Sequence, residues 1–511
     1  MEQIKNDSPK FCFFVLFTLS CIMIIGFRWL VLKDFSFKHI DSDQAIMWNA
    51  AVDFSNGIFH EPRFFGQNYN SMLEGILSVP LLWCSLPVYK ALPITTSFLA
   101  LFPFFLVSII CIVKNLRVQA LIVVSIPLFL PLEYDFLTSL PRGFVTGIFV
   151  SSFGWIAIFF PNKKWAIFCF GFFTVVGYSL NPNALILTIP LFAYLFIENI
   201  KIWLFYLKLF IGLGAGWIIH FFINYFYVAN PNYNSRQLPP LDFSFHTLIS
   251  SFEDLDKHFN SVSPIFWNSG WLVFVAFIII GLAFLKQKKA ALVFAVFICI
   301  AFTLLSLGFA KIHDGTDSIF FSYARMFLVI PVGFAFFIPF IKIKKTWIGY
   351  VFPLVSIFFL FLKLALLPSS ISSNVDHKRN HILSVDPIEY VLSDCHKINY
   401  YSKKHKTDLV IVYDHGYYDF IDFGCSACLD SFPKTLRPEY ERRTWRLVED
   451  KNIVYSNIII IDEHQKIASR LSRLTEKSIL FLNVNGYYIV SGNTLKTEDF
   501  LSLLNIPIRD F

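Results

Sequence analysis

Long apolar runs separated by short polar segments fill the first 370 residues of the chain. Several runs, such as 121–132, 143–160 and 351–367, approach the roughly 20 residues that a helix needs to cross a bilayer. One soluble core can hold a single run of this kind, but not a long series of them. Slightly shorter runs can still cross where the bilayer thins locally. The pattern therefore predicts a polytopic α-helical membrane protein.

Compact basic loops alternate with longer, mostly acidic loops between these runs. Short loops rich in Lys and Arg stay in the cytoplasm. The basic positions are Lys114, Arg117, Lys163, Lys164, Lys201, Lys286, Lys288, Lys289, Lys342, Lys344 and Lys345. Segment 71–92 is apolar enough to span, but a span there would break the alternation. We interpret it as a juxtamembrane or re-entrant element on the outer side, with the N-terminus of the chain in the cytoplasm.

This topology gives about eleven transmembrane helices. The predicted spans are 11–32, 96–113, 118–132, 143–160, 165–180, 182–197, 204–226, 271–285, 290–308, 326–341 and 347–367. The first is interpreted as an uncleaved signal anchor, because its apolar stretch is long and no small-residue cleavage site follows it. Two spans meet in a very tight outer turn at Asn181-Pro182-Asn183.

The pattern changes after residue 367. A linker is predicted at 368–374, followed by a small α/β extracytoplasmic domain over 368–511, separate from the membrane domain 1–367. Strand-like runs lie at 409–413, 457–461, 479–484 and 487–491, and helical patterns lie at 387–394, 463–474 and 497–504. Asn485-Gly486 between the last two strands is a strong hairpin signal.

Composition supports this division. Of the 511 residues, 56% are hydrophobic and only 15% are charged, whereas soluble chains average about 25% charged. Much of the net charge of +7 lies in the cytoplasmic loops, so it does not indicate a nucleic-acid partner. Cys395, Cys425 and Cys428 lie in the outer domain, where we favour a structural disulfide over a free or redox role and leave the pairing open. A lone Cys-x-x-Cys without a second ligand pair argues against zinc.

The first outer loop, 33–95, is rich in groups able to do chemistry. Asp41 and Asp43 follow the first span, and Glu74 opens an apolar segment. Carboxylates at the membrane boundary are costly unless they are solvated, paired or used. The simpler alternative is that the two Asp side chains are solvated and cap the following helix, which is an ordinary role for Asp.

Several short motifs in this loop resemble a known family. Ser42-Asp43-Gln44-Ala45, Asn56-Gly57, Phe65-Gly66-Gln67-Asn68-Tyr69 and Leu73-Glu74 resemble the first outer loop of GT-C membrane glycosyltransferases, most of all bacterial relatives of the protein mannosyltransferases. The resemblance is sharp in this loop, loose over the membrane core and absent from the C-terminal domain. It implies an essential Asp here, juxtamembrane helices after the first span, and a polyprenyl-phosphate sugar as donor. The family usually has Asp-Glu where this chain has Asp43-Gln44, so the presence of a second acid stays open; Glu74 or Asp41 could supply it.

The chemistry of such a donor assigns roles to particular residues. A carboxylate near the bilayer surface can take the acceptor's proton, and Asp43 is the predicted base. Arg suits a departing phosphate through its bidentate fork. The predicted phosphate-binding residues are Arg142, Arg325, Lys311 and His313, and the predicted substrate-binding residues are Arg63, Gln67 and Tyr69. The alternative for each cation is snorkelling at the interface, which is the interpretation adopted for Lys363.

Other sites are weaker. His60 and Glu61 could join Asp43 around a divalent metal, but scattered ligands without fixed spacing are a weak signal, so no metal cofactor is predicted. Loop 227–270 could cover an acceptor site or be a solvated packing surface, and stretch 440–446 could bind sugars or form a charged strand. The sequence holds no P-loop, no Gly-rich dinucleotide turn and no nucleophile elbow, which argues against a cytoplasmic nucleotide-sugar enzyme.

The leading hypothesis is an inverting glycosyltransferase of the bacterial plasma membrane. It would act on the outer face, with the bilayer and a polyprenyl-phosphate sugar as partners and an acceptor (lipid, glycan or protein) that stays open. A transporter or flippase for a lipid-linked glycan would instead place ionisable residues near the bilayer midplane and often show internal repeats. A non-catalytic scaffold is the third alternative, for which Asp43→Ala would leave function intact.

Overall fold

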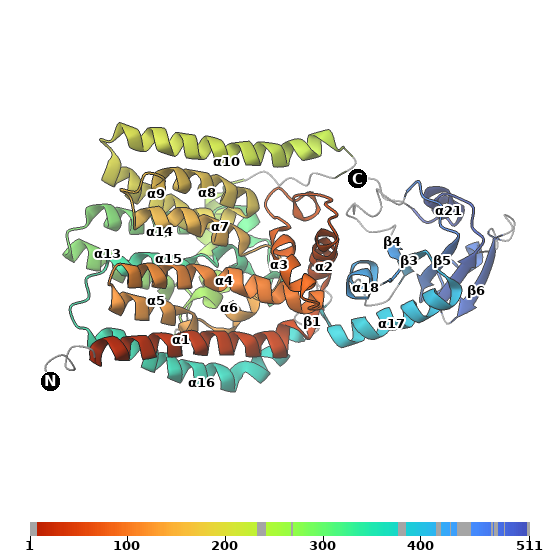
Figure 1. Ribbon diagram of the computed structural model, residues 1–511, viewed down its shortest axis with the longest axis horizontal. Helices are drawn as coiled ribbons and strands as arrows, with labels where there is room; N and C mark the ends of the chain where they lie inside the picture. The colour runs from red at the N-terminus through yellow and green to blue at the C-terminus, as the bar shows by residue number, and fades with distance from the viewer. Residues whose placement is uncertain are drawn as a thin grey trace.

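The protein is described here by a computed structural model. It describes residues 8–231, 233, 242–266, 269–376, 385–414, 421–429, 431–436, 451–471, 474, 479–484 and 486–507. Stretch 440–446 therefore lies outside the described residues. The described chain is mostly helical, with a mixed five-stranded sheet towards its C-terminal end. Figure 1 shows helices of the first part running alongside one another and the sheet lying beyond one end of this bundle.

Six helical segments are long and apolar enough to cross a membrane, as expected for a multi-pass protein. They are Phe11–Ser36, Val88–Val113, Pro182–Asn199, Trp203–Ala229, Tyr323–Phe340 and Trp347–Val375. Shorter apolar helices lie at the other predicted spans: α5 (Arg117–Phe129), α7 (Thr146–Trp155), α8 (Ala166–Leu180), α13 (Leu272–Lys286) and α14 (Ala290–Ser306). That these also cross, giving about eleven spans, stays a prediction.

Segment 71–92 does not form one spanning helix. It holds α3 (Leu73–Trp83), a turn, and the start of α4 (Val88–Val113), which begins eight residues before the predicted span. Helix α3 has only 11 residues and packs against α2 (Ser42–Ser55) and α4. Figure 1 shows α2 and α3 at the end of the bundle that faces the sheet. This position fits a juxtamembrane element.

Small residues allow close helix packing at the edge of the bundle. A Cβ on Gly212 of α10 (Trp203–Ala229) would lie 2.2 Å from the Phe168 carbonyl oxygen of α8, and one on Gly171 would lie 2.7 Å from the Leu209 carbonyl oxygen. Lipid supplies no hydrophobic drive for helix association, so close backbone contact at small residues has to stabilise such pairs. These glycines therefore hold α10 against α8.

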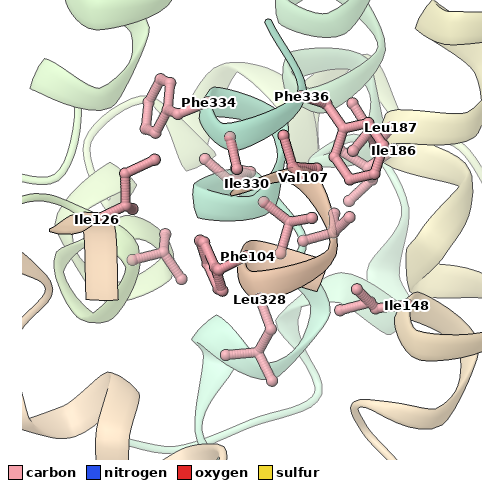
Figure 2. Packing of buried hydrophobic residues seen from close by; sticks show 14 of the residues in the cluster. Phe104, Val107, Ile126, Ile148, Ile186, Leu187, Leu328, Ile330, Phe334 and Phe336 are labelled. Carbon is pink, nitrogen blue, oxygen red and sulfur yellow. The ribbon is translucent and has the colours of Figure 1, made fainter. Parts of the chain in front are cut away.

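The bundle core surrounds α15 (Ile330–Phe337), whose residues are all buried. Figure 2 shows Ile330, Phe334 and Phe336 of this helix among side chains of α4 and α9 (Leu185–Asn199), including Phe104. Phe336 also meets Trp155 edge to face, with ring centroids 5.3 Å apart. Because α15 is apolar on every side, other helices can enclose it completely without burying an unpaired polar group.

A charged cluster lies inside the bundle. Arg28 Nη2 of α1 (Ser8–Val31) lies 3.0 Å from Asp135 Oδ1 of α6 (Leu132–Leu137). Lys363 of α16 (Trp347–Val375) is fully buried and pairs with the other carboxylate oxygen of Asp135. The interpretation of Lys363 as a snorkelling residue is therefore wrong: its ammonium turns inward because a buried carboxylate is there to pair with it.

The predicted linker at 368–374 is also wrong, because α16 continues without a break to Val375. Pro368 lies inside this helix, as membrane helices tolerate. Beyond it, Ser369 Oγ donates to the Leu366 carbonyl at 3.0 Å and Asn374 Nδ2 donates to the Ser370 carbonyl at 2.9 Å. Such side-chain hydrogen bonds pair with backbone carbonyls along the last turns of α16. The Pro, Ser and Asn content of this segment alone predicts a loop.

The C-terminal sheet has strand order β4-β3-β5-β7-β6. Its strands are β3 (Leu409–Asp414), β4 (Lys434–Leu436), β5 (Asn457–Asp462), β6 (Leu480–Val484) and β7 (Tyr487–Ser491). β4, β3 and β5 are parallel, whereas β7 is antiparallel to both β5 and β6. The four strands predicted from the sequence are all present, and Gly486 between β6 and β7 has a φ of +84°.

The helices of this region match the prediction less well. The first runs over Ile388–His405 (α17), much longer than 387–394, and the last over Thr497–Leu503 (α21). The single helix predicted at 463–474 is wrong for its first part: residues 463–471 form turns and one short 3-10 helix, Ala468–Arg470, and helical backbone is found only at Leu474 among the described residues of this range. The Asp462 carboxylate accepts bonds from the Lys466 and Ile467 amides at 2.9 Å each, and such bonds favour a turn over a helix.

The two faces of the sheet belong to different cores. Alternate residues such as Leu409 and Ile411 face a core of the domain itself, whereas Val410 and Val412 face a core shared with the first outer loop. This follows from the period of two along a strand. The shared core includes Trp48 of α2 and the Cys395–Cys425 disulfide, which joins α17 to α18 (Ile421–Cys428). The disulfide interpretation is confirmed, and Cys428 is free and half-buried.

Candidate active site

The site begins where the first outer loop meets the C-terminal region. Strand β1 (His39–Asp41) pairs antiparallel with β2 (Val385–Pro387), and Asp41 then caps α2. Asp41 Oδ1 accepts from the Gln44 backbone amide at 3.2 Å, and its Oδ2 accepts from Gln44 Nε2 at 2.7 Å. The capping alternative is thus correct for Asp41, but this carboxylate is fully buried rather than solvated.

Arg142 joins the two aspartates. Its Nη2 lies 2.8 Å from Asp41 Oδ1 and 3.0 Å from Asp43 Oδ2. Burial raises the pKa of Asp41, and the Arg142 guanidinium opposes that rise. The Asp43 side chain is 24% exposed, whereas that of Asp41 is 0% exposed. Asp43 is therefore the member of the pair that reaches solvent.

Gln44 contacts the buried carboxylate of Asp41. A side-chain amide at position 44 donates to the Asp41 carboxylate, whereas a Glu there would place a third carboxylate against it.

Glu74 lies behind the site. Its Oε2 accepts from the Gly143 amide at 3.0 Å, and the side chain is fully buried. Burial raises the pKa of Glu74 to about 8. Gly143 has a φ of +76°, and Asn70 next to it donates from Nδ2 to the Arg142 carbonyl at 2.9 Å. Glu74 and Asn70 therefore fix the backbone that carries Arg142.

A cavity of about 430 Å³ opens beside Asp43 and Arg142. The structure brings six of the sequence-predicted site residues to its wall: Asp43, Gln67, Tyr69, Arg142, Lys311 and Arg325. The remaining wall is largely apolar and includes Leu185, Ile186, Phe302, Phe309 and Met326. The cavity is thus polar around the first outer loop and apolar between the helices.

Two further cations face this cavity. Arg325 Nη1 donates to the Ser322 carbonyl at 2.8 Å, Nη2 donates to the Asp314 carbonyl, and the guanidinium lies 4.1 Å from the centre of the Phe321 ring. Lys311 pairs with the Asp314 carboxylate, and its Nζ lies 5.2 Å from the centre of the Tyr69 ring. Arg325 is thus held by neutral carbonyls and a ring, whereas the charge of Lys311 is matched by Asp314, so Arg325 is the cation better placed to meet an anion in the cavity.

Two predicted ligands of the substrate lie away from the cavity wall. Arg63 Nη2 donates to Asn224 Oδ1 at 2.5 Å and its guanidinium lies 5.3 Å from the Tyr227 ring centre. His313 Nε2 lies 2.8 Å from the Leu307 carbonyl, and His313 Nδ1 lies 3.2 Å from His258 Nε2. Burial lowers the pKa of His258 to about 4. Substrate binding by Arg63 and phosphate binding by His313 stay predictions. In the structure Arg63 contacts α10, and His313 contacts Leu307 and His258.

Residues of the tight outer turn also line the cavity, although the sequence analysis assigned them no role. Asn181 Nδ2 donates to the Gly143 carbonyl at 3.2 Å, and Asn183 Nδ2 donates to the Phe144 carbonyl at 2.8 Å. The sequence feature that could have pointed to them is the Asn-Pro-Asn turn between two apolar runs, because polar side chains in such a place need hydrogen-bond partners.

The side chains considered as metal ligands have other partners. His60 Nε2 lies 3.0 Å from Asp53 Oδ2, and Glu61 Oε2 accepts from the Tyr227 hydroxyl at 2.8 Å. Burial raises the pKa of Glu61 to about 7. Across the part of the chain that the structure describes, no group of three or more His, Cys, Asp or Glu side chains is arranged to hold a metal ion.

Comparisons with protein-family models, with curated proteins and with solved structures found no match. The chemistry of this chain must therefore be inferred from the cavity itself. Asp43, a partly exposed carboxylate on the same cavity wall as Arg142, Lys311 and Arg325, can accept a proton next to a bound anion.

Proposed function

We propose that the protein is an inverting glycosyltransferase that moves a sugar from a polyprenyl-phosphate donor to an acceptor hydroxyl or amine. The observation that carries this proposal is the 430 Å³ cavity, which places Asp43 among Arg142, Lys311 and Arg325 and continues between apolar helices. A lipid-linked phosphate has an anionic head, which suits the charged part of the cavity, and an apolar tail, which suits the part between the helices. The resemblance of the first outer loop to GT-C enzymes supports the same class.

The reaction would be a single nucleophilic displacement at the anomeric carbon, in which each cavity residue has a different role. The acceptor's oxygen or nitrogen attacks the anomeric carbon while the bond from that carbon to the phosphate oxygen breaks. Asp43 takes the acceptor's proton, since its carboxylate is the exposed one of the pair. Arg325 and Lys311 stabilise the negative charge of the departing polyprenyl phosphate. Arg142 holds Asp43 and Asp41 in place, with its guanidinium 2.8 and 3.0 Å from their oxygens.

The same proposal includes the topology. The N-terminus would be cytoplasmic, and the cavity and the C-terminal domain would lie on the outer face of a bacterial plasma membrane. The basic loops support this orientation through the positive-inside rule. Pairing of β1 with β2 joins the first outer loop to the C-terminal region, so both lie on one side.

Transfer from a radiolabelled polyprenyl-phosphate sugar pool, in membranes that contain the full chain, tests the proposal. We expect Asp43→Asn to lower transfer about 10²–10⁴-fold, the usual contribution of a general base. Asp34→Asn is the matched control, because Asp34 is an exposed carboxylate paired only with Lys38 at 3.1 Å. Each variant is checked for expression and for its melting temperature.

The outcomes separate the enzyme from the transporter. Equal transfer by wild type and Asp43→Asn would remove Asp43 from the chemistry. A lack of transfer by the wild type with every donor, together with movement of a lipid-linked glycan across the bilayer, would favour the transporter. The buried ions Arg28, Asp135 and Lys363 are paired with one another and do not line the cavities described here, which gives no support to an ion pathway.

A further inference from the structure

A second cavity lies on another side of the bundle. It has a volume of about 540 Å³ and is bounded by α5, α13, α15 and α16. All of its lining residues are apolar. Two of them, Phe266 and Ile279, are 51% and 59% exposed in the protein alone. Since α16 is a candidate membrane span, this groove opens towards lipid rather than water, and only an apolar chain fills it favourably.

Aromatic rings shape one end of this apolar groove. Phe129 of α5 lies 5.4 Å from Phe359 of α16 between ring centres, and Phe266 lies 5.5 Å from Phe359. The Ile265 amide donates to the Phe129 carbonyl at 2.7 Å, which fixes the loop that carries Phe266 against α5. The groove is therefore built by packed side chains at this end and not by a loose gap.

A polar cavity of about 590 Å³ continues from the same end, and Pro264 lines both cavities. Its wall carries three carboxylates, those of Glu133, Asp256 and Asp317, and one ammonium, that of Lys257. Lys257 Nζ is shared with a further carboxylate, Asp254 Oδ1 at 2.9 Å. The wall thus has an excess of negative charge and one cation.

These two cavities together match a particular kind of lipid. An ammonium group of a headgroup would be attracted by the three carboxylates and can donate up to three hydrogen bonds. Asp256 would accept through Oδ2, because its Oδ1 accepts from Ser269 Oγ and the Gly270 amide at 2.7 Å each. Its phosphate would lie at Lys257, beside the polar side chains of Asn260 and Ser261 on the same wall. An anionic lipid would meet the excess of carboxylates, and a quaternary ammonium would have no hydrogen to donate.

We propose that this groove and its polar cavity bind a zwitterionic aminophospholipid of the bilayer, with one acyl chain in the groove. The site differs from the one that contains Asp43. Segment 314–325 separates them: Asp314 and Arg325 line the Asp43 cavity, whereas Thr316 and Ser322 line the lipid cavity. The inference is independent of the proposed glycosyl transfer.

Lipid retention by the full chain tests this inference. The protein is purified in detergent, incubated with phosphatidylethanolamine, phosphatidylcholine or phosphatidylglycerol of equal chain length, and the retained lipid is counted by native mass spectrometry. We expect phosphatidylethanolamine to be retained at least fivefold more than either of the others. Equal retention of the three lipids, or displacement of phosphatidylethanolamine by an equimolar polyprenyl phosphate, would overturn the proposal.

Two variants with matched controls locate the site. Glu133→Gln removes one carboxylate of the polar cavity and should abolish the preference for the amine, whereas Glu253→Gln, on an exposed part of a neighbouring loop, should keep it. Ala276→Trp fills the groove and should lower retention of all three lipids, whereas Leu282→Trp on the lipid-exposed side of α13 should not. Unchanged retention in both Glu133→Gln and Ala276→Trp would contradict the proposal.

Discussion

Glu74 offers the sharpest test of the physical account of the site. Its carboxyl is fully buried, accepts the Gly143 amide through Oε2, and has a pKa raised by burial to about 8. The side chain should therefore be protonated at neutral pH. A neutral isostere, Glu74→Gln, keeps an acceptor for the Gly143 amide and removes the group that has to lose a proton at higher pH.

The magnitude follows from linkage. The pKa of this carboxyl is about 8 in the folded protein and 4.5 as its ordinary value, so the unfolded chain loses its proton first as pH rises. Between these two pKa values the folded state binds more protons, and stability falls with rising pH. At 1.36 kcal/mol per unit, the loss between pH 5 and pH 8 is on the order of 3 kcal/mol. Glu74→Gln should escape this loss.

Thermal unfolding measured at pH 5 and pH 8 gives the result. With an unfolding entropy of about 2.1 cal/mol/K per residue, 3 kcal/mol in a chain of this length corresponds to roughly 3 °C. We expect Glu74→Gln to melt about 3 °C above wild type at pH 8, with little difference at pH 5. Glu253→Gln, an exposed control, should show no such difference.

The same variant examines the chemistry. Because the Glu74 carboxyl does not line the cavity, Glu74→Gln should keep transfer within a few-fold of wild type, unlike Asp43→Asn. If Glu74→Gln were folded but inactive, or melted lower than wild type at pH 8, the side chain would be ionised in the native protein. The account of Glu74 as a buried neutral support would then be refuted.

Three further perturbations test the framework. Gly143→Ala should lower the free energy of unfolding by more than 2 kcal/mol and abolish transfer, because a Cβ at φ +76° would lie 1.9 Å from Asn70 Oδ1. Gly57→Ala is the control: its φ is +77°, but its Cβ meets open space, so chemical denaturation should show a loss of only about 1 kcal/mol. Cys395→Ala should cost about 2–4 kcal/mol by opening the disulfide, while Cys428→Ala should change the melting temperature little. Asp135→Asn should cost about 3–5 kcal/mol in thermal unfolding, because it leaves two buried cations with one neutral partner.

The sequence predicted most of what is set by periodicity and charge. Apolar runs located the candidate spans, and short continuous runs rich in Val and Ile located β3 and β5 of the sheet. The motifs of loop 33–95 and the charged residues at the ends of apolar runs predicted six residues of the cavity wall. Placing Arg or Asp in lipid is costly, so such side chains usually face the protein interior or a water-filled cavity.

What the sequence could not predict depends on long-range pairing. Lys363 looks like a snorkelling residue until Asp135, more than 200 positions earlier, supplies its counter-ion. Pro368 and the serines after it look like a linker, although local side-chain bonds keep them helical. The cavity contacts of Asn181 depend on the position of Gly143, which no local pattern encodes.

The C-terminal domain is also more closely joined to the site than a boundary at 368 suggests. Its β2 pairs with the strand that ends at Asp41, and the Ser426 hydroxyl of α18 donates to Asn49 Oδ1 of α2 at 3.1 Å. The sheet buries one face against Trp48 and its neighbours in α2. The C-terminal region therefore contacts α2 at two places: β2 pairs with the strand before its N-terminus, which carries Asp41 and Asp43, and α18 and the sheet pack against Trp48 and Asn49. A chain ending at Val375 would leave β1 without its partner strand and would remove the side chains of the sheet and of α17 that share a core with Trp48, so we expect the geometry that presents Asp43 to the cavity to need both parts of the molecule.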